Sequence, residues 1–496
     1  MQHWRIAIFA IMIGTAPPAR AQLNPQVDKV EKTVQKVIQQ SEAAIACILV
    51  SRSDAYQRVA QNGDKDYPGK LGTFDPFMLK GLGDLSEKDR ILLQKKLDLA
   101  DPNHLPQAFG SGVVIDGNGY ILTNYHVVQD ATKIFVRLPG GKGSYADIHA
   151  ADPRSDLAVL KVLNAKILPL KAIPLGDADQ AQRGQFIVTL ANPYAAGFHD
   201  GQPSASLGIL SNIRRRVMHG FKEEDRVKPL QYYSTLLQTD ARLHLGSSGG
   251  ALLNLQGEMI GLITALAAIQ GGETPGGFAI PINSGMRRII DVLKRGEEID
   301  YGFLGVGFEE RPGNDQRGIV LSQVGKGTPA DLDGKLKDRD VLIAVNGKPI
   351  NTSDDIFVVI GTQLAGTKVR LQIVRGGQEI ASEVTLGKLY VPGERIYSST
   401  GSRPMLRGMR VDYASLVVQK PPRWFHLPAG VLVSEVQPNS PAARAGLKTG
   451  DVITRCNDRP VTSPAAFYDA MPAFGAVDLT LYQYPADGNA VKIKLK

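Results

Sequence analysis

The chain has 496 residues, a formal net charge of +8, 43% hydrophobic and 21% charged residues. These proportions are ordinary for globular proteins and exclude a wholly disordered chain, and the length suggests about three domains. Many glycines and prolines (52 and 30) with only 6% aromatic residues favour short strands and turns over long helices.

The two cysteines, Cys47 and Cys456, lie in separate regions and are predicted to be small buried residues. Two cysteines exclude a disulfide framework and a four-ligand zinc site. The eight histidines are scattered, so we expect neither a catalytic metal nor another cofactor. The basic balance permits anionic partners, but no aromatic residues alternate with the arginine run 214–216, so no nucleic acid is expected and that run is predicted to be a solvated loop.

The first 21 residues have the layout of a secretory signal peptide. Arg5 supplies a positive charge, residues 6–14 form an apolar run, and Ala19-Arg20-Ala21 is a cleavage site of small residues. The alternative, a membrane anchor, needs about 20 apolar residues, which this run does not provide. We therefore expect cleavage after Ala21 and a mature protein that works outside the cytoplasm.

Helical periodicity predicts a helix over residues 26–41, and the apolar run 44–50 predicts a buried strand. Residues 54–105 form an irregular insertion. From 109 to 282 short apolar runs alternate with Gly, Pro, Asn and Asp, which is typical of a sandwich or barrel. Residues 286–294 are predicted to form a closing helix.

The remainder of the chain contains an internal repeat. Residues 318–350 match residues 430–461, at an offset of 112 residues. Because solenoid repeats have periods of about 20–50 residues, this spacing indicates two duplicated domains. The stretch 390–404, rich in Ser, Gly and Pro, is predicted to link them.

Three segments carry residues suited to nucleophilic catalysis. TNYHVV places His126 after an apolar strand, DPRSDLAVLKV places Asp156 before another, and LHLGSSGGALLN places Ser248 in a glycine-rich turn. A serine hydroxyl needs a base to take its proton, and a carboxylate behind a histidine fixes the tautomer of that base. The glycines let backbone N–H groups of the turn, at Gly246, Ser247 and Ser248, form an oxyanion hole.

The order His, Asp, Ser with GxSGG resembles chymotrypsin-type serine proteases. The segments TNYHVV, DLAVLK and GSSGGAL, followed by two repeats, resemble the HtrA (Deg) family. This resemblance implies a mainly β fold, with a double β-barrel protease domain followed by two PDZ-like α+β domains. It further implies ATP-independent cleavage of misfolded or unfolded proteins in the bacterial periplasm by a homo-oligomer, a trimer or a multiple of one.

The resemblance also sets the expected domain boundaries. The N-terminal helix, first strand and insertion occupy residues 22–108, and the protease domain occupies 109–296, with its barrel beginning near residue 44. The PDZ domains are expected at 300–389 and 405–496, joined by the linker. The insertion 54–105 is either a flexible loop or a regulatory loop that reaches the active site, and both interpretations stay open.

Further site residues follow from the same resemblance. The substrate pocket is expected to be lined by Arg242, Ile263, Thr264 and Ala265. The first PDZ domain is expected to bind peptide carboxylates through Leu304, Gly305 and Val306, whereas the second repeat has Arg407 in place of Leu304 and is expected mainly to support assembly.

The chain also departs from the family pattern. Leu245 and Ser247 replace the usual Pro and Asn before the serine, and Arg242 and His244 stand where small or uncharged residues are usual. The alternative function is therefore a chaperone or peptide-binding protein on the same scaffold with little proteolysis.

Overall fold

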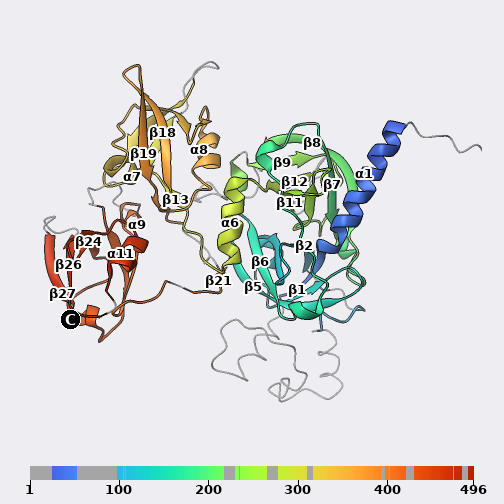
Figure 1. The fold of residues 1–496 in the computed structure, drawn as a ribbon, viewed down its shortest axis with the longest axis horizontal. Helices are drawn as coiled ribbons and strands as arrows, with labels where there is room; N and C mark the ends of the chain where they lie inside the picture. The colour runs from blue at the N-terminus through green and yellow to red at the C-terminus, as the bar shows by residue number, and fades with distance from the viewer. Residues whose placement is uncertain are drawn as a thin grey trace, which may run out of the picture.

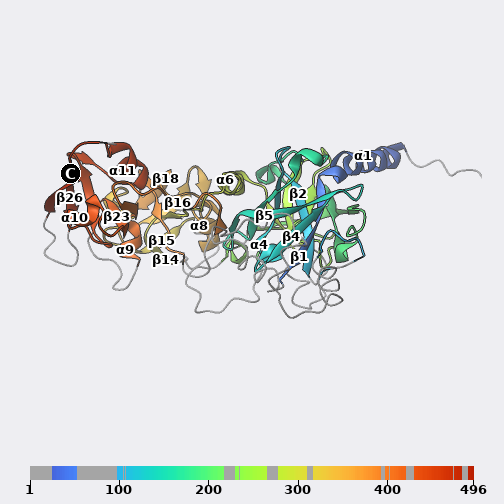
Figure 2. The same cartoon turned by 90° about the horizontal axis from the view of Figure 1, so that it is seen from below.

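The computed structural model describes residues 25–52, 98–103, 106, 108–216, 229–233, 235–264, 277–309, 317–391, 397–401, 403–419, 429–472, 474–482 and 490–495. The predicted signal peptide, most of the insertion and Ala265 lie outside these residues. Within them, no helix is long and apolar enough to cross a membrane. The N-terminal β-rich body lies at one end of the molecule and the two repeats lie at the other (Figures 1 and 2).

The β-rich body begins with a helix that leads into a six-stranded barrel. Helix α1 (Pro25–Ser41) and the short η1 (Glu42–Ala44) precede β1 (Ile45–Ser51). The other strands are β2 (Ala108–Val114), β3 (Tyr120–Asn124), β4 (Lys133–Arg137), β5 (Gly143–Asp152) and β6 (Leu157–Val162). Their order is β5-β4-β1-β2-β3-β6, and pairing of β5 with β6 closes the barrel.

The second barrel has six strands in the closed order β10-β11-β12-β9-β8-β7. They are β7 (Phe186–Ala191), β8 (Ser204–Arg215), β9 (Leu236–Thr239), β10 (Ala251–Leu253), β11 (Met259–Thr264) and β12 (Gly277–Pro281). Helix α6 (Ser284–Lys294) closes the body, and its N-cap Asn283 accepts a hydrogen bond from Met286 N. The expectation of a mainly β fold with two six-stranded barrels is confirmed.

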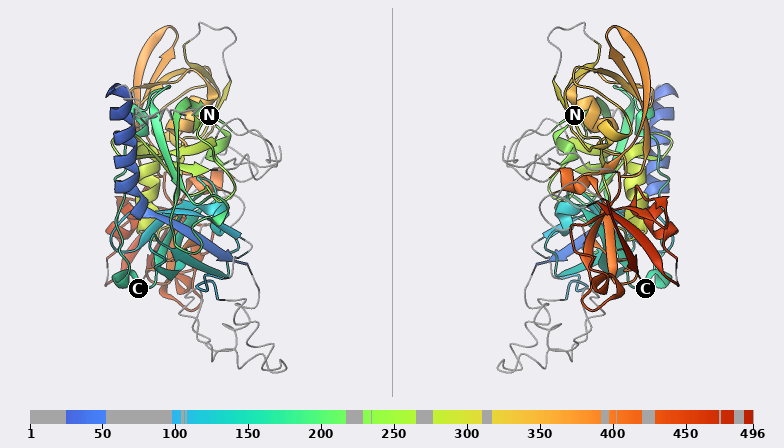
Figure 3. Two further views of the ribbon diagram at one scale, coloured as in Figure 1. Left: turned by 90° about the vertical axis from the view of Figure 1, so that its right-hand side faces the viewer. Right: turned by 90° about the vertical axis from the view of Figure 1, so that its left-hand side faces the viewer.

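Short helical segments complete the body. Helix α4 (Tyr125–Val128) follows β3, and the 3₁₀ turns are η3 (Ala165–Ile167), η4 (Ala178–Gln180), η5 (Pro193–Ala195) and η6 (Leu230–Tyr232). One side of α1 packs on the barrel core through Val34 and Ile38, while Val27 and Val30 near its start are exposed. Figure 3 shows α1 standing along one side of the body.

The first repeat is a small sheet with two helices. Its sheet has the order β14-β15-β16-β18-β19. The elements are β13 (Gly302–Phe303), β14 (Val306–Glu309), β15 (Ile319–Val324), α7 (Pro329–Leu332), β16 (Val341–Val345), β17 (Lys348–Pro349), α8 (Ser353–Val359), β18 (Lys368–Arg375), β19 (Gln378–Thr385) and β20 (Gly387–Lys388). Its buried apolar residues form a cluster of their own, as expected for a separate domain.

The second repeat has the same topology, with sheet order β22-β23-β24-β26-β27 and its own core. Its elements are β22 (Met409–Tyr413), α9 (Ser415–Val418), β23 (Val431–Val436), α10 (Pro441–Arg444), β24 (Val452–Cys456), β25 (Arg459–Pro460), α11 (Pro464–Ala470), β26 (Val477–Tyr482) and β27 (Ala490–Leu495). Helices α8 and α11 correspond, and each begins after a hydroxyl N-cap, Thr352 or Ser463. Cys47 and Cys456 are buried, as predicted.

The stretch between the repeats returns to the β-rich body. Strand β21 (Tyr397–Ser398) pairs with Ala150 and Ala151 of β5 and adds a seventh strand to that sheet. The Ser399 hydroxyl lies 2.9 Å from His149 Nδ1, and the Thr400 hydroxyl donates to Gly296 O at 2.7 Å. The described part of this stretch is therefore held against the first barrel by backbone and side-chain hydrogen bonds.

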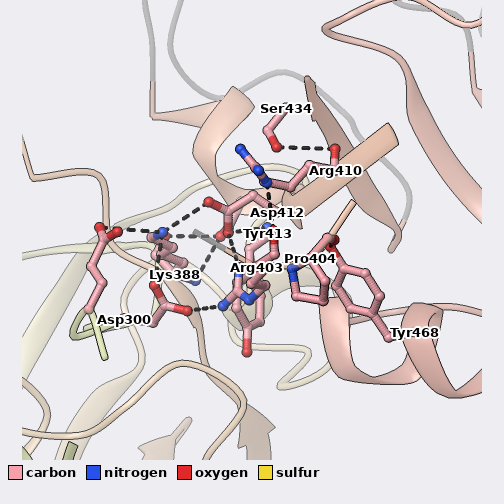
Figure 4. Close-up of polar contacts among 11 residues, drawn as sticks. Asp300, Lys388, Arg403, Pro404, Arg410, Asp412, Tyr413, Ser434 and Tyr468 are labelled. Carbon is pink, nitrogen blue, oxygen red and sulfur yellow. Dashed lines mark hydrogen bonds and ion pairs between the residues drawn. The ribbon is translucent and has the colours of Figure 1, made fainter. Parts of the chain in front are cut away.

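A ring of alternating charges joins the second repeat to the rest of the chain (Figure 4). Lys388 Nζ lies 2.8 Å from Asp300 and 2.9 Å from Asp412, and Arg403 contacts the same two carboxylates. Burial lowers the pKa of Lys388, but the Asp300 and Asp412 carboxylates outweigh it and raise that pKa above its usual value. Asp412 lies in β22, so the ring connects this strand to β20 and to the segment that precedes β13.

The first repeat contacts the second barrel through α8. Arg214 forms an ion pair of 2.7 Å with Asp355, and Arg216 approaches Asp354 at 3.6 Å. The ring of Tyr233 stacks on Phe357 with centroids 3.8 Å apart. Residues 214–216 are exposed, as predicted, but the expected loop is wrong for Arg214 and Arg215, because β8 extends to Arg215. Acidic side chains of α8 also pair with two of the three arginines.

Candidate active site

His126 and Asp156 are brought together by the pairing of two strands. Strand β3 ends at Asn124, which pairs with Leu157 at the start of β6. Tyr125 N donates to Asp156 O at 3.0 Å, so helix α4 begins against the residue that precedes β6. His126 in the first turn of α4 therefore lies over the Asp156 side chain.

The Asp156 carboxylate is surrounded by donors. Its two oxygens lie 3.0 and 2.9 Å from His126 Nδ1, and Oδ1 also accepts the His126 backbone N–H at 3.0 Å. Asn124 Nδ2 donates to Oδ2 at 3.1 Å. Asp156 has a φ of +57°, a left-handed conformation that is uncommon outside glycine and that Asp tolerates better than most residues. The backbone is thus turned so that the carboxylate faces the histidine.

The Asp156 carboxylate stabilises the protonated form of His126. Burial acts first and lowers its pKa, but the charge of Asp156 and the hydrogen bond to it together raise the pKa above the usual value. Nδ1 is hydrogen-bonded to Asp156. Nε2 is buried, and within the described part of the chain it has no hydrogen-bond partner. The imidazole therefore has one nitrogen that is hydrogen-bonded to the carboxylate and one that makes no hydrogen bond to the described residues.

Ser248 lies in a tight turn between β9 and β10, which we call the serine turn (residues 244–250). Ser247 N donates to His244 O at 2.9 Å, and Gly246 between them has a φ of +89°, as the third residue of a type II turn requires. Gly249 has a φ of +86°, and a Cβ there would lie 1.9 Å from Ser111 O. Glycine is needed at both places, which explains the composition of the motif.

The serine turn lies against the strand that borders α4. Ser111 N of β2 donates to Ser248 O at 2.8 Å. A Cβ on the neighbouring Gly110 would come within 3.3 Å of Ser248 O and 2.6 Å of the Val127 side chain. The backbone of Ser248 and the residue after His126 thus share one neighbour, where the two barrels meet.

The turn residues expected at the oxyanion hole differ in the hydrogen bonding of their backbone N–H groups. The Ser247 N–H is used within the turn by His244 O. The Gly246 N–H has no acceptor among the residues that the structure describes. Ser248 itself is buried, with 4% of its surface exposed.

The residues expected to line the substrate pocket differ in their exposure to solvent. Ile263 and Thr264 are buried on β11, and Thr264 Oγ1 has no hydrogen-bond partner within the described ranges. Arg242 is exposed at the surface. Ala265 lies outside the described residues.

The loop expected to bind carboxylates in the first repeat begins beside β13. Leu304 O accepts from Ala330 N (2.9 Å), and Gly305 O accepts from Gly325 N (3.0 Å). Gly305 has a φ of +90°, and a Cβ there would lie 2.2 Å from Thr328, so only glycine fits. Val306 follows as the first residue of β14.

The equivalent loop of the second repeat is closed by its own contacts. Arg407 O and Gly408 O accept equivalent bonds, from Ala442 N and Gln437 N, so Arg407 occupies the place of Leu304. Met409 N donates back to Leu406 O at 2.9 Å. The Arg407 guanidinium donates to Gly475 O and Pro472 O, beyond the end of α11.

Sequence reasoning missed two residues that hold the site. Asn124 orients Asp156, and Ser111 contacts the serine turn; both are fully buried. A buried polar residue inside an otherwise apolar strand is the signal that could have pointed to them. Within the residues that the structure describes, no cluster of His, Cys, Asp and Glu could hold a metal ion.

Comparisons with known proteins agree with this architecture. Residues 110–262 match the model of a trypsin-like peptidase domain, and residues 302–386 and 432–475 match models of PDZ domains. The periplasmic serine endoprotease DegP of Salmonella typhimurium is 34% identical over 75% of this chain and 74% of its own length. The periplasmic pH-dependent serine endoprotease DegQ of Escherichia coli is 34% identical over 77% of this chain and 79% of its own length.

A solved structure supports the fold. The HtrA-type protease AlgW with a tripeptide is 24% identical, with a TM-score of 0.50 over 72% of this chain and 98% of that one. Identity above 30% across three quarters of both chains, together with the peptidase domain and two PDZ domains in the same order, is decisive. The chain belongs to the HtrA (Deg) family of serine endoproteases.

Proposed function

We propose that this protein is an exported serine endopeptidase that cleaves unfolded proteins, with Ser248 as nucleophile, His126 as general base and Asp156 as the residue that orients the base. The observation that carries the proposal is the His126–Asp156 pair. Nδ1 lies 2.9 Å from the carboxylate while Nε2 is buried without a partner in the described chain. Such an imidazole has one nitrogen fixed and the other ready to take a proton.

We infer the following steps for these proposed roles. Nε2 accepts the Ser248 proton as Oγ bonds to the substrate carbonyl carbon, and the carbonyl oxygen becomes an oxyanion. The N–H groups of Gly246 and Ser248 stabilise that charge. The imidazolium then gives its proton to the leaving amine, the peptide bond breaks, and an acyl-enzyme forms. Water deprotonated by His126 releases the acyl group and regenerates the serine.

A serine-reactive phosphonate tests the proposal. We expect it to label the mature protein on Ser248, with the labelled peptide located by mass spectrometry. The Ser248→Ala variant should fold normally, escape labelling and fail to cleave an unfolded test protein. Undiminished cleavage by purified Ser248→Ala would refute the assignment. The alternative of a chaperone without proteolysis is not favoured, because the curated relatives are named endoproteases.

We further propose the periplasm as the place of action and a homo-oligomer, a trimer or a multiple of one, as the working form. The predicted signal peptide and the periplasmic relatives support the compartment. The exposed apolar residues Val27 and Val30 of α1 are available to a second copy of the chain. Light scattering on the mature protein measures the assembly, and a monomer at working concentration would contradict it.

The two PDZ domains are proposed to differ in ligand binding. PDZ domains capture a peptide C-terminus with backbone N–H groups and add the peptide as a strand. In the first domain an apolar Leu304 stands beside the glycine loop. In the second, Arg407 bonds across to the carbonyls beyond α11, and Met409 N already donates within the loop.

Swapped residues test this difference in the full-length Ser248→Ala protein. A peptide with an apolar C-terminal residue should bind through its carboxylate, and its C-terminal amide should bind weakly. Leu304→Arg, which imports the residue of the second domain, should abolish that binding, whereas Arg407→Leu should not reduce it. Loss of binding in Arg407→Leu alone would reverse the assignment.

A further inference from the structure

One buried side chain of the first barrel, Ser111 on β2, is bonded to the serine turn at several points. Ser111 is fully buried. Its N–H donates to Ser248 O at 2.8 Å, and its own carbonyl accepts from Thr123 Oγ1 at 2.7 Å. The backbone of Ser111 is thus fixed between β3 and the residue that carries the proposed nucleophile.

The Ser111 hydroxyl makes two further bonds whose directions follow from its single proton. Asn192 N–H can only donate, so the hydroxyl oxygen accepts from it, at 2.8 Å. The hydroxyl proton is then given to Gly246 O, at 2.7 Å. The hydroxyl therefore connects the β7–β8 connection, where Asn192 lies, to the carbonyl of the proposed oxyanion-hole residue.

These bonds fix the orientation of two successive peptide groups. In a trans peptide, C=O and N–H point in opposite directions. With Gly246 O held by Ser111, the Ser247 N–H points away and meets His244 O. Leu245 O is likewise held by Tyr194 N, at 2.6 Å, so the Gly246 N–H points away from Tyr194.

We propose that Ser111 is a positioning residue for peptide-bond cleavage: by holding the Gly246 carbonyl, its hydroxyl keeps the Ser247 N–H on His244 O and so keeps the serine turn closed, and the closed turn leaves the Gly246 N–H of the preceding peptide group to the oxyanion. The inference rests on the proposed function. Ser111 contacts no substrate, because it is buried beneath the turn. Loss of the hydroxyl leaves Gly246 O and Asn192 N–H buried without their partner, which costs free energy. A rotation of the turn that brings Gly246 O to another donor is then favoured.

Kinetics of Ser111→Ala separate this role from general stability. Losing one oxyanion donor costs about 100-fold or more in kcat. We expect Ser111→Ala, whose donor is displaced rather than removed, to lose at least about tenfold in kcat, with KM within about twofold. The pH midpoint of kcat/KM should not move, because His126 and Asp156 keep their contacts. The rate of phosphonate labelling at Ser248 should fall in parallel with kcat.

The matched control is Ser144→Ala, which removes another buried hydroxyl from the same barrel. Ser144 Oγ donates to Tyr145 O and accepts from Asn164 N, neither of which belongs to the serine turn. This variant should keep wild-type kcat and labelling rate. Thermal denaturation of each variant shows that the assay is made on folded protein. Ser111→Cys, with a weaker donor of similar size, should lose less kcat than Ser111→Ala at unchanged KM.

The outcomes are distinct from those of the proposed function. A wild-type protein that is not labelled on Ser248 refutes the proposed function. Normal wild-type labelling with an unchanged kcat in folded Ser111→Ala refutes the role of Ser111 alone. A loss that appears only in KM, or equally in Ser144→Ala, also overturns it. If Ser111→Ala does not fold, a wild-type kcat in folded Ser111→Gly, which also lacks the hydroxyl, gives the same refutation.

Discussion

Replacing Asp156 by Asn tests the core of the site most directly. The two carboxylate oxygens accept from His126 Nδ1, His126 N and Asn124 Nδ2. An amide has one acceptor oxygen, and the backbone N–H and Asn124 still require it. The amide NH₂ then faces Nδ1, which must become an acceptor. The imidazole proton moves to Nε2, so the nitrogen that should take the Ser248 proton already carries one.

The expected loss follows from that tautomer. A substitution of this kind lowers kcat by about 10⁴-fold, which corresponds to about 5.4 kcal/mol of transition-state stabilisation. The variant should keep KM for a peptide substrate within a few-fold, because Asp156 is not among the residues proposed to line the substrate pocket. Steady-state kinetics with Asp156→Asn at pH 8 give both numbers. A kcat within tenfold of the wild type would refute the assignment of Asp156.

The pH dependence of activity provides a second, independent test of the role of Asp156. The wild-type pKa of His126 is raised, and only neutral His126 can accept a proton. Activity should therefore rise with pH through a midpoint above about 6.5, the usual histidine value. In Asp156→Asn burial remains without the carboxylate, so the midpoint should move to lower pH. A midpoint that stays in place would contradict the stated cause of the shift.

The contribution of the His126–Asp156 pair to folding stability should fall as pH rises, whereas activity should rise. The carboxylate favours the protonated imidazole in the folded protein, so this contribution is fully present below about pH 6.5 and is lost as pH rises through the raised pKa. The stability difference between wild type and Asp156→Asn, measured by urea unfolding, should therefore shrink over that window.

Three further predictions concern the turn, the pocket and the charged ring. Gly246→Ala should lower kcat about 100-fold, because a Cβ there meets Asn192 O at 2.8 Å and φ is positive; wild-type kcat would refute the proposed oxyanion role. Cleavage-site profiling should show small aliphatic residues before the cut, since Arg242 is exposed; enrichment of Asp or Glu would contradict this. Lys388→Met should loosen the second PDZ domain and speed proteolysis of residues 397–403, whereas the exposed Lys448→Met should not; equal rates would exclude the ring as the restraint.

Local patterns were enough to predict much of this protein. The 3.6-residue periodicity of α1, the short apolar runs of the barrels and the glycine-rich turn are properties of neighbouring residues, and neighbouring residues set them. The duplication was equally visible, because each repeat closes a core of its own and keeps its apolar positions. Motif spacing likewise singled out His126, Asp156 and Ser248 as candidates.

Only the tertiary structure decided how distant segments meet. Ser111 and Gly246 are 135 positions apart, and their hydrogen bond exists only because β2 and the serine turn pack where two closed barrels meet. The return of β21 to β5 and the pairing of Arg214 with Asp355 are of the same kind. Such contacts depend on strand order and domain placement, which the residues on either side do not encode locally. The sequence motifs therefore identified residues whose side chains could do the chemistry, and the tertiary structure determined which distant residues contact them.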